Sequence, residues 1–446
     1  MTFLTFLLRV ARSAATVFPF SPQLSPRPPK AFRVRFGISQ NDTARGARRR
    51  PQTEITALVS PRGAVCHATV SFSLIDPRLM KSAHIATLHH RHDTRILLKQ
   101  CVSLANEGYD VALFVSDGDG DEVFNGVNIV DVGRTGGRVA GRLVPMWRAA
   151  RQARKFKPDV IHFHDGMFLP FAILLAAAGY RVIYDVHEDY PREVFAWRFS
   201  WPVRYAASVS YAVLEWIGGL MFTKILAATP HIARRFPKRK THTIRNFPLH
   251  EELVASDATP YAMRAPHFAY VGKITVDRGI REVVDALPRI DKAQVILDLA
   301  GAFDPAALRE EIERMPGWRH VLDRGWVGRE DIARMLGGAR AGLVVLHPRE
   351  NYLYSYPIKL FEYMAAGLPV IVSDFPLWRH LIGDARCGLF VDPRDPAAIA
   401  QAMAWILDNP DEAEAMGERG RLAVEDEYNW AQESRTLLQC YRALAA

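Results

Sequence analysis

The feature that most constrains the fold of this 446-residue chain is a repeated alternation of short apolar runs with helical segments, which begins near residue 80. Such runs, separated by helices, are typical of parallel sheets whose strands are joined by crossover helices. The pattern pauses once, between Phe247 and Pro266, and then resumes. It therefore predicts an α/β protein with two Rossmann-like, doubly wound parallel-sheet domains that face each other across a cleft.

The apolar runs give specific expectations for the strands and helices. In the first half we expect strands at His84–Leu88, Asp110–Val115, Asp159–Phe163, Arg181–Val186 and Lys224–Ala228. In the second half we expect them at His267–Val271, Gln294–Ala300, His320–Trp326, Gly342–Leu346, Pro369–Ser373 and Gly388–Val391. Helices are expected at Ile96–Glu107, Arg142–Phe156, Pro396–Asn409, Pro410–Glu425 and Trp430–Ala446.

This pattern divides the chain into five segments. They are an N-terminal extension (1–79), an N-terminal Rossmann-like domain (80–250), a linker (251–262), a C-terminal Rossmann-like domain (263–428) and a final helix (429–446) that we expect to pack back on the N-terminal domain. The extension is rich in Pro, Arg and Ser, a composition that resists packing into a core. It is open to three interpretations: a disordered tail, a targeting peptide, or an over-extended start, with Met80 as the true first residue.

The net charge of +9 lies entirely in this extension, which holds 12 basic and 3 acidic residues, whereas residues 80–446 hold 45 of each. The expected domains are therefore neutral overall, and we expect no nucleic-acid partner. The four cysteines form no CxxC pair, so the sequence indicates neither a zinc site nor a disulfide framework. A reducing, cytoplasmic location is expected, with the inner face of the cytoplasmic membrane as a further possibility.

The segment Tyr270–Ile280 reads YVGKITVDRGI and takes a predicted strand into a glycine turn. Gly272 and Lys273 lie at the turn, and Arg278 precedes a predicted helix. Two cations beside a helix N-terminus suit a diphosphate group, because exposed backbone N–H groups and positive charge both attract anions. The alternative is a solvated loop with incidental charges, and the segment alone does not decide between the two.

A second segment, Tyr356–Asp374, reads YPIKLFEYMAAGLPVIVSD. Pro357 suits the start of a helix, and Gly367 suits its end before a buried strand. Glu362 would then point into the cleft, where a carboxylate can accept both hydroxyls of a ribose. The alternative is that Lys359 and Glu362 form an ordinary pair on the helix surface.

Together with the turn Leu299–Gly301 and the stretch Trp326–Gly328, these motifs resemble the donor-binding signature of retaining GT-B glycosyltransferases, close to glycosyltransferase family 4 and its bacterial surface-polysaccharide members. The resemblance spans about residues 80–446. It implies that the C-terminal domain binds a UDP- or GDP-linked sugar as co-substrate, with no resident cofactor and no metal. The donor-binding residues it implies are Gly272, Lys273, Arg278, Gly301, Val327, Pro357, Ile358, Lys359, Leu360 and Glu362.

By this resemblance Lys273 and Arg278 contact the diphosphate and Glu362 contacts the ribose. One position departs from the pattern of the family, which often has two glutamates separated by seven residues. The first of them is Tyr354 here, and Glu350 lies four residues earlier. The motif therefore does not identify the donor sugar.

In the first half, the loop His89–Arg95 follows the first predicted strand, at the edge of the sheet where α/β proteins bind ligands. Asp93 suits an N-cap and Arg95 suits an anion contact, although the loop could serve only to cap its helix. It resembles the opening of bacterial polysaccharide glycosyltransferases. With His164, these two residues form the expected acceptor-binding set.

Polar side chains also follow two neighbouring strands, in the runs His162–Asp165 and Asp185–Pro191. Several His and acidic residues at adjacent strand ends favour a site over a structural role. The resemblance assigns His187 a place near the anomeric carbon and implies that the leaving diphosphate itself helps to take the acceptor proton. The catalytic candidates are His187, Asp165 and Glu188, and none is assigned as a general base.

An aromatic stretch lies between Trp197 and Met221 and includes Trp201, Tyr205, Tyr211 and Trp216. Aromatic stripes usually fill protein interiors, which is the interpretation we favour. Aromatic residues mixed with Arg204 would alternatively suit peripheral contact with a membrane and a lipid-linked acceptor.

The sequence thus predicts a retaining hexosyltransferase that moves a hexose from a nucleotide diphosphate sugar to a glycan or lipid-linked acceptor, in polysaccharide or glycolipid biosynthesis. Two alternatives remain: a GT-B nucleotide-sugar epimerase, which would act on the donor alone, and a non-catalytic scaffold of the same fold that binds glycans or nucleotides.

Overall fold

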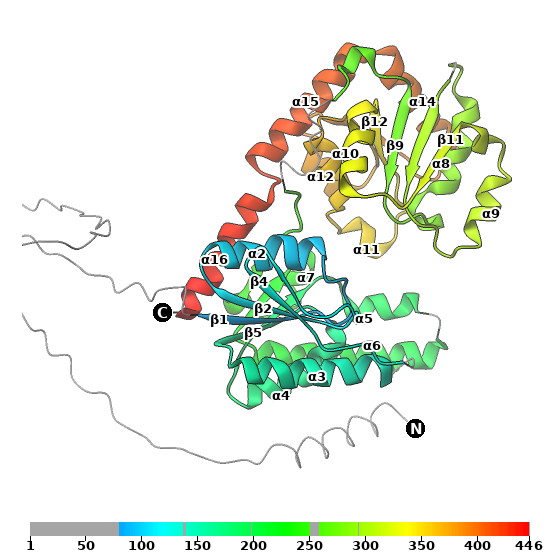
Figure 1. Ribbon diagram of the computed structural model, residues 1–446. Coiled ribbons are helices and arrows are strands. Elements are labelled where there is room, and N and C mark those ends of the chain that lie inside the picture. The colour runs from blue at the N-terminus through cyan, green and yellow to red at the C-terminus, as the bar shows by residue number, and fades with distance from the viewer. Residues whose placement is uncertain (1–79, 137–139, 198, 250–257, 293, 446) are drawn as a thin grey trace, which may run out of the picture. The chain divides into compact units, whose positions relative to one another are not determined.

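The computed structural model describes residues 80–136, 140–197, 199–249, 258–292 and 294–445. The predicted extension (1–79) and most of the predicted linker (251–262) lie outside the described residues. The described residues belong to one compact unit. Within it, the strands form two separate sheets (Figure 1).

The first sheet has eight strands in the order β3-β4-β2-β1-β5-β6-β7-β8. All neighbours pair in parallel except β3 and β4, which are antiparallel. The strands are β1 (Lys81–Ile85), β2 (Asp110–Val115), β3 (Glu122–Phe124), β4 (Val127–Asp131), β5 (Val160–Phe163), β6 (Arg181–Val186), β7 (Lys224–Ala227) and β8 (Thr241–Thr243).

Helices connect these strands and cover both faces of the sheet. They are η2 (Thr94–Cys101), which is a π-helix, α2 (Val102–Asn106), α3 (Ala140–Phe156), η3 (Gly166–Phe168), α4 (Leu169–Ala177), α5 (Tyr190–Glu193), η4 (Val194–Ala196), α6 (Trp201–Met221), α7 (Pro230–Ala233) and η5 (Lys238–Lys240).

The second sheet has six parallel strands in the order β11-β10-β9-β12-β13-β14. They are β9 (His267–Val271), β10 (Ile296–Ala300), β11 (Val321–Gly325), β12 (Ala341–Val344), β13 (Val370–Ser373) and β14 (Gly388–Val391). The helices are η6 (Tyr261–Met263), η7 (Val276–Arg278), α8 (Ile280–Ala286), η8 (Leu287–Arg289), α9 (Leu308–Glu313), η9 (Pro316–His320), α10 (Arg329–Gly338), α11 (Glu350–Leu353), α12 (Ile358–Ala365), α13 (Pro376–Ile382), α14 (Pro396–Asp408), α15 (Pro410–Asp426) and α16 (Trp430–Ala445).

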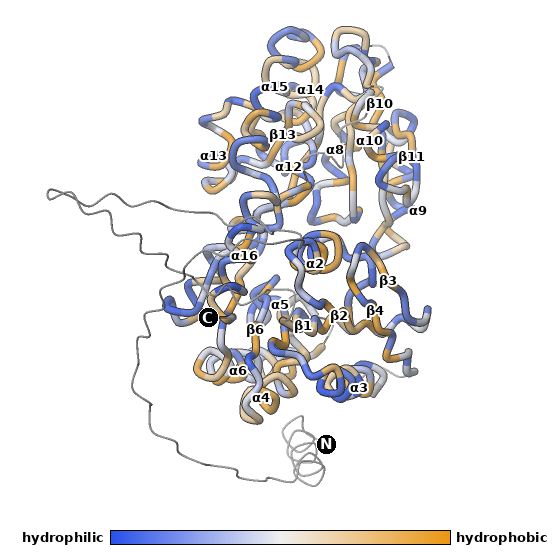
Figure 2. Tube along the Cα trace, turned by 60° about the vertical axis from the view of Figure 1, so that its left-hand side comes forward, coloured by the Kyte–Doolittle hydropathy of each residue, from blue (hydrophilic) through white to orange (hydrophobic). Residues whose placement is uncertain are grey.

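Successive side chains of a strand point to opposite faces of the sheet. Both faces of each sheet are buried, so side chains of both kinds are apolar. In β1, for example, Ala83 and Ile85 join one apolar cluster with α3 and α4, and the opposite face of the sheet packs against η2 and α2. The hydropathy-coloured tube in Figure 2 shows hydrophobic segments in the strands and hydrophilic ones in many loops and outer helix turns. Two-sided burial explains why the strands are nearly continuous apolar runs in the sequence.

The last helix, α16, returns to the first sheet rather than remaining with the second (Figure 1). Trp430, Leu437 and Tyr441 are buried in the same cluster as Leu97 and Leu104. The Trp430 indole N–H also donates to the Ser103 hydroxyl at 2.9 Å. The C-terminal segment is therefore part of the N-terminal core.

All eleven predicted strands are present, with ends that shift by no more than three residues. The hairpin β3–β4 was not predicted, although its turn is Asn125-Gly126 with positive φ at both residues. An Asn-Gly pair is a strong hairpin signal, because a type I′ turn needs two residues that tolerate positive φ. The predicted helix Ile96–Glu107 is a π-helix that continues as a short α-helix.

The interpretation of the aromatic stretch as core is wrong for most of its residues. Trp201, Tyr205 and Trp216 are exposed on α6, and the exposed fraction is 70% for Trp201 and 67% for Trp216. Of these aromatic residues, Tyr211 packs against the apolar cluster beneath the helix. Among the described residues, no helix combines the length and apolar character needed to cross a bilayer.

We expect Gly342→Ala to destabilise the second sheet, because a Cβ at this position of β12 would lie 2.2 Å from the ring of Tyr363. Tyr363 cannot retreat freely, since its hydroxyl oxygen accepts the Val271 N–H at 2.8 Å. The cost should be about 1–3 kcal/mol, as for other overpacked cores. Urea unfolding measures it, with Gly338→Ala as the control, because a Cβ there meets nothing within 4 Å. Equal midpoints for both variants would contradict the prediction.

Candidate functional site

Two loops at the carboxyl edge of the second sheet approach each other through glycines. Gly272 follows β9 and has a φ of 105°, which favours glycine. A Cβ at Gly301, after β10, would lie 1.9 Å from the carbonyl oxygen of Gly272. Only glycine therefore fits at position 301. This close backbone approach at a sheet edge is the arrangement that α/β proteins use to admit phosphate groups.

Cationic side chains gather beside these loops. Lys273 is half exposed and forms an ion pair with Asp304. The Arg278 guanidinium lies about 4 Å from the position that a Cβ on Gly272 would take, and it donates to the Lys273 carbonyl at 3.4 Å. The predicted diphosphate contacts are thus neighbours of the predicted glycine turn.

Lys359 is the most unusual of these cations. Its side chain as a whole is partly buried, but its Nζ atom is out of contact with solvent and has no hydrogen-bond acceptor among the described residues. The Nζ lies 4.3 Å from the centre of the Tyr270 ring. Burial, and then the positive charge of Arg278, lower the pKa of Lys359 to about 7, although Glu362 opposes the shift. A buried ammonium group without an acceptor is suited to an incoming anion.

Glu362 is buried on α12 and accepts a hydrogen bond from Arg329 at 2.8 Å. Arg329 begins α10 and was not predicted as a site residue. Of the other donor-binding residues predicted here, Pro357 is the N-cap of α12, and Leu360 lies in its first turn and is fully buried in the core. Leu360 therefore supports the helix and does not reach a ligand.

Tyr354, which occupies the position of the first family glutamate, stacks on His231 of α7 with ring centres 4.3 Å apart. Glu350, the possible substitute, is exposed and pairs with Arg192 of α5 at 2.7 Å. Neither residue faces the buried Lys359. Instead, both contact helices that follow strands of the first sheet.

In the first sheet, Asp93 caps η2, as predicted, by accepting the backbone N–H groups of Arg95 and Ile96, both at 2.9 Å. The Arg95 side chain is buried and forms a bidentate pair with Asp185, at 2.6 and 3.1 Å. It also donates to the Ile244 carbonyl at 3.0 Å. Most of the hydrogen-bonding capacity of Arg95 is therefore used inside the protein.

Asp185 is the centre of this half of the site. Besides Arg95, its carboxylate accepts hydrogen bonds from Gln100 at 2.7 Å, His164 at 3.1 Å and His187 at 2.7 Å. Burial alone would raise the pKa of Asp185, but the charges and hydrogen bonds of these partners hold it well below its usual range. The His187 Nε2–H is committed to Asp185, so Nδ1 is the ring atom left to meet a ligand.

A chain of hydrogen bonds leads from this carboxylate to the last helix. His164 donates at Nδ1, so its Nε2 accepts from His84 Nδ1 at 3.1 Å. The Nε2 of His84 accepts from the Tyr441 hydroxyl at 3.1 Å, and the Tyr441 oxygen accepts from Ser82 at 3.0 Å and from His162 at 2.9 Å. Burial lowers the pKa of all three histidines, which are therefore neutral and have fixed tautomers.

These histidines are close enough to form a set of metal ligands: His84, His162 and His164 in one group, and His164, Asp185 and His187 in another. Their ring nitrogens, however, lie at hydrogen-bond distances from one another and from Asp185, and donors and acceptors match along the chain. The arrangement fits a hydrogen-bond network. It also places His164 in the interior, where it holds Asp185 and does not reach an acceptor.

The other two catalytic candidates are Asp165 and Glu188. Asp165 is buried and holds the loop after β1, accepting from Thr87 at 3.0 Å, Leu88 N–H at 3.1 Å and His89 at 2.8 Å. Glu188 is exposed. Although burial opposes it, Asp165 raises the pKa of His89. These contacts give Asp165 a supporting role in the loop.

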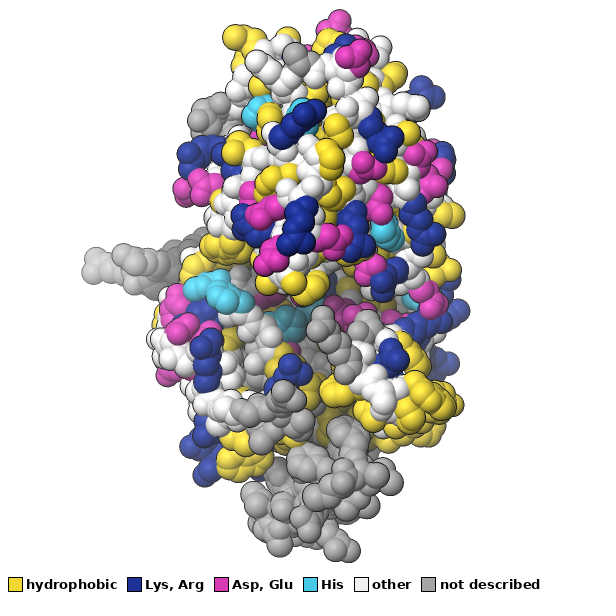
Figure 3. Space-filling view, turned by 90° about the vertical axis from the view of Figure 1, so that its right-hand side faces the viewer, with side chains coloured by type: hydrophobic (Ala, Val, Ile, Leu, Met, Phe, Trp, Pro, Cys, Tyr) yellow, Lys and Arg dark blue, Asp and Glu magenta, His cyan; other side chains and the backbone are white. Residues whose placement is uncertain are grey.

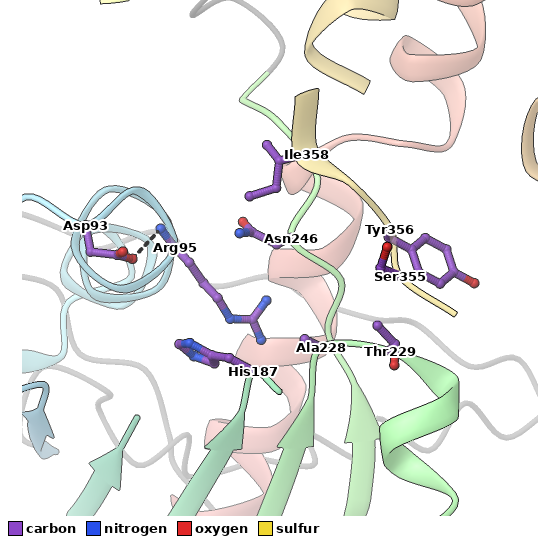
Figure 4. Close-up of a pocket in the computed structure, with 9 residues that line it drawn as sticks. All are labelled: Asp93, Arg95, His187, Ala228, Thr229, Asn246, Ser355, Tyr356 and Ile358. Atoms are coloured by element: carbon purple, nitrogen blue, oxygen red, sulfur yellow. Dashed lines mark hydrogen bonds between the residues drawn. The ribbon is translucent and has the colours of Figure 1, made fainter. Parts of the chain in front are cut away.

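A pocket of about 220 Å³ lies at the carboxyl ends of the first sheet. Figure 4 shows the residues that line it. Its lining comes from both halves of the chain: Asp93, Arg95, His187, Ala228, Thr229 and Asn246 from the first, and Ser355, Tyr356 and Ile358 from the second. Asn246 accepts from the buried Lys99 at 2.7 Å. The pocket thus joins three predicted site residues of the first domain to the segment that opens α12.

The structure brings most of the predicted residues into two groups. Gly272, Lys273, Arg278, Gly301, Lys359 and Glu362 form one, and Asp93, Arg95 and His187 form the other. Sequence reasoning missed Arg329 and Asn246, and it noted Asp185 in a polar run without naming it as a site residue. Asp185 carried a signal, since it is the penultimate residue of a buried strand, two residues before His187. Arg329 and Asn246 carried no such signal in the sequence. The partner of Arg329 is more than thirty residues away, and that of Asn246 is more than one hundred residues away.

Comparison with protein-family models gives two matches. Residues 94–247 match the family described as Glycosyltransferase Family 4, and residues 257–423 match the family described as Glycosyl transferases group 1. The first match spans strands β2 to β8 and includes Arg95 and His187 but not Asp93, and the second spans the second sheet and all residues of its group.

Similar proteins agree with these matches. The glycogen synthase of Mycobacterium tuberculosis is 25% identical over 303 residues, which are 65% of this chain and 70% of that protein. The phosphatidyl-myo-inositol mannosyltransferase of Mycobacterium leprae is 29% identical over 170 residues, 38% of this chain and 44% of that protein. The solved structure of Anabaena HepE in complex with UDP-glucose has a TM-score of 0.63 at 12% identity, and the match covers 82% of this chain and 100% of that chain.

We expect Tyr441→Phe to destabilise the protein by about 1–3 kcal/mol, because it removes the donor to His84 and leaves buried groups unsatisfied. Tyr109→Phe is the matched control. Tyr109 is also buried and its ring contacts that of Tyr441, but its hydroxyl has no partner among the described residues. Urea unfolding should show a change for Tyr109→Phe within about 0.5 kcal/mol. Equal effects of the two variants would mean that the hydrogen-bond chain contributes nothing.

We expect Lys359→Met to raise stability at neutral pH by roughly 1–3 kcal/mol, since one pKa unit corresponds to about 1.4 kcal/mol and the side chain is only partly buried. The pKa of Lys359 is about 7 when folded, below its unfolded value near 10.4, so the unfolded chain binds more protons between these values. The cost of Lys359 is therefore full below pH 7 and disappears as pH rises towards 10.4.

Thermal unfolding between pH 6 and pH 10 checks this trend. The exposed Lys292, which pairs with Asp408, provides the control Lys292→Met. The difference between wild type and Lys359→Met should shrink with rising pH, whereas that for the control should stay small throughout. A constant difference would show that Lys359 is not buried as a charge.

Proposed function

This chain is a GT-B glycosyltransferase of the family 4 type, and we propose that it transfers a hexose, with retention of configuration, from a UDP- or GDP-linked sugar to a glycan or lipid-linked acceptor. Such a reaction belongs to polysaccharide or glycolipid biosynthesis at the inner face of the cytoplasmic membrane. HepE, which shares the fold, binds UDP-glucose, and this supports a nucleotide sugar as the donor.

The observation that carries the proposal is the buried Nζ of Lys359, which has no acceptor among the described residues and lies within the electrostatic reach of Arg278. Arg278 adds positive charge next to the Lys359 Nζ, which is itself out of contact with solvent. A diphosphate would neutralise both. Glu362, on the same helix, would accept the ribose hydroxyls while sharing Arg329.

The proposed transfer relies on positioning and charge more than on a protein nucleophile. Asp93 is the only carboxylate in the lining of the pocket, and its Oδ1 atom accepts two backbone N–H groups. Asp185 and Asp165 are enclosed by their own donors. This supports a route in which a diphosphate oxygen takes the acceptor proton and His187, held by Asp185, orients the sugar through Nδ1.

The polar lining of the pocket suits hydroxyl groups. Thr229, Asn246 and Ser355 offer neutral donors and acceptors, and the one cation, Arg95, is already paired. We therefore propose a sugar hydroxyl as the acceptor group at this position. The tyrosine at position 354, stacked on His231, leaves the donor sugar open.

Titration of the chain with UDP, GDP, their hexose conjugates and a non-nucleotide sugar tests the donor site. We expect one nucleotide to bind selectively. Glu362→Ala should weaken binding at least about tenfold, as expected for the loss of a charge-assisted hydrogen bond. Lys273→Ala should weaken it severalfold, because Lys273 is half exposed, and Lys292→Ala should leave it unchanged.

Each outcome distinguishes the proposal from its alternatives. Binding followed by sugar transfer only when an acceptor is present supports the transferase. Epimerisation or hydrolysis of the donor without an acceptor would indicate the epimerase. Donor binding without turnover, or no nucleotide binding at all, would indicate a scaffold of the same fold.

A further inference from the structure

Three helices form the outer layer on one face of the first sheet. α4 contacts both α6 and β6, and α3 contacts α4, β1 and β2. Figures 1 and 2 both show α3, α4 and α6 side by side along this face. Their inner residues join one apolar cluster with the strands. The helices α3, α4 and α6 are called the outer helical face below.

The outward side of α6 is an apolar stripe. Trp201, Tyr205, Val209, Val213, Trp216 and Leu220 are spaced by three or four residues, so they lie along one side of the helix, and all six are exposed. Leu220 is 61% exposed. Hydrophobic side chains also gather at the lower right of the surface in Figure 3. A contiguous stripe of this size on a folded domain marks an interaction surface.

The helix α3 adds positive charge and a further tryptophan to the same face. Trp147 is exposed, and the Arg151 guanidinium lies 5.7 Å from the centre of its ring. Arg142 and Arg151 are exposed and form no ion pair with a described residue. The face therefore combines aromatic rings with cations, the composition of surfaces that lie in a membrane interface.

The same face lacks exposed negative charge. The sequences of α3 and α4 contain no Asp or Glu, and the single acid of α6, Glu215, is buried and paired with Arg235. Residues 80–446 as a whole contain as many acids as bases, so this local absence is not a consequence of overall composition. It leaves a surface with one sign of charge around an apolar stripe.

We propose that the outer helical face docks on an anionic lipid bilayer, with α6 lying in the plane of the interface. The apolar stripe would enter the boundary between head groups and acyl chains, while Arg142 and Arg151 contact anionic head groups. A second copy of the chain is a poorer occupant, because a two-fold contact through this face would bring arginines of the two copies together with no acid to separate them.

This inference extends the proposed function, because a docked enzyme meets a lipid-linked acceptor at the surface where it resides. Vesicle binding and nucleotide binding are separate measurements. Loss of one with retention of the other shows which of the two proposals has failed.

Co-sedimentation of the full chain with vesicles tests the proposal. We expect binding to phosphatidylcholine vesicles that contain roughly 30 mol% of the anionic lipid phosphatidylglycerol. The double variant Trp201→Glu/Trp216→Glu should reduce the affinity at least about tenfold. Met263→Glu, at an equally exposed apolar residue of the other domain, is the control and should bind as wild type does.

A charge-reversed pair isolates the electrostatic part. Arg142→Glu/Arg151→Glu should weaken binding to anionic vesicles by about tenfold or more, whereas Arg314→Glu, at an exposed arginine beyond this face, should not. Because residues 1–79 also carry a net charge of +9, the result is the difference between variants of the same full chain. Unchanged vesicle binding in both double variants would overturn the proposal. It would also be overturned if the wild type did not bind vesicles and Trp201→Glu/Trp216→Glu converted a dimer to a monomer.

Discussion

The buried pair of Arg95 and Asp185 is the interaction on which the first half of the site depends. An isolated charge in the interior of a sheet is costly, so each member requires the other, and Gln100, His164 and His187 donate further hydrogen bonds to the Asp185 Oδ2 atom. Because Asp185 remains ionised, it fixes the hydrogen on His187 Nε2 and the orientation of that ring. The loop after β1 and the end of β6 are joined by the same pair.

The network also couples distant parts of the chain. Tyr441 belongs to the last helix, yet it donates to His84 in the first strand, and the order of donors and acceptors then runs through His164 to Asp185. The C-terminal helix therefore contributes to the tautomers of a site that lies on the N-terminal sheet. In the second half, the Lys359 Nζ lies over the Tyr270 ring and has no hydrogen-bond acceptor among the described residues. The Asp185 carboxylate therefore receives its hydrogen bonds from within the protein, whereas the Lys359 ammonium group finds no acceptor in the described part of the chain.

Much of the fold could be predicted because parallel strands that are buried on both faces have nearly continuous apolar sequences. The eleven expected strands follow from this rule, whereas β8 is short and polar and gave no such signal. The glycine turn, the cations near it and Glu362 could be proposed because they are local in sequence or belong to a family signature. Three features could not be predicted, because they depend on residues brought together from distant segments. They are the central role of Asp185, the pairing of Glu362 with Arg329 and the interior position of His164.

The aromatic helix shows the same limit. Its spacing establishes that Trp201, Tyr205 and Trp216 share one side, but a helix with such a stripe can turn it towards the core or away from it. The sequence by itself determined the class of fold, the number of sheets and the local motifs, because these depend on periodicity and short-range turn chemistry. Only the tertiary structure decided which polar groups are neutralised by partners and which apolar side chains stay exposed, because burial is a property of all the elements packed around a residue.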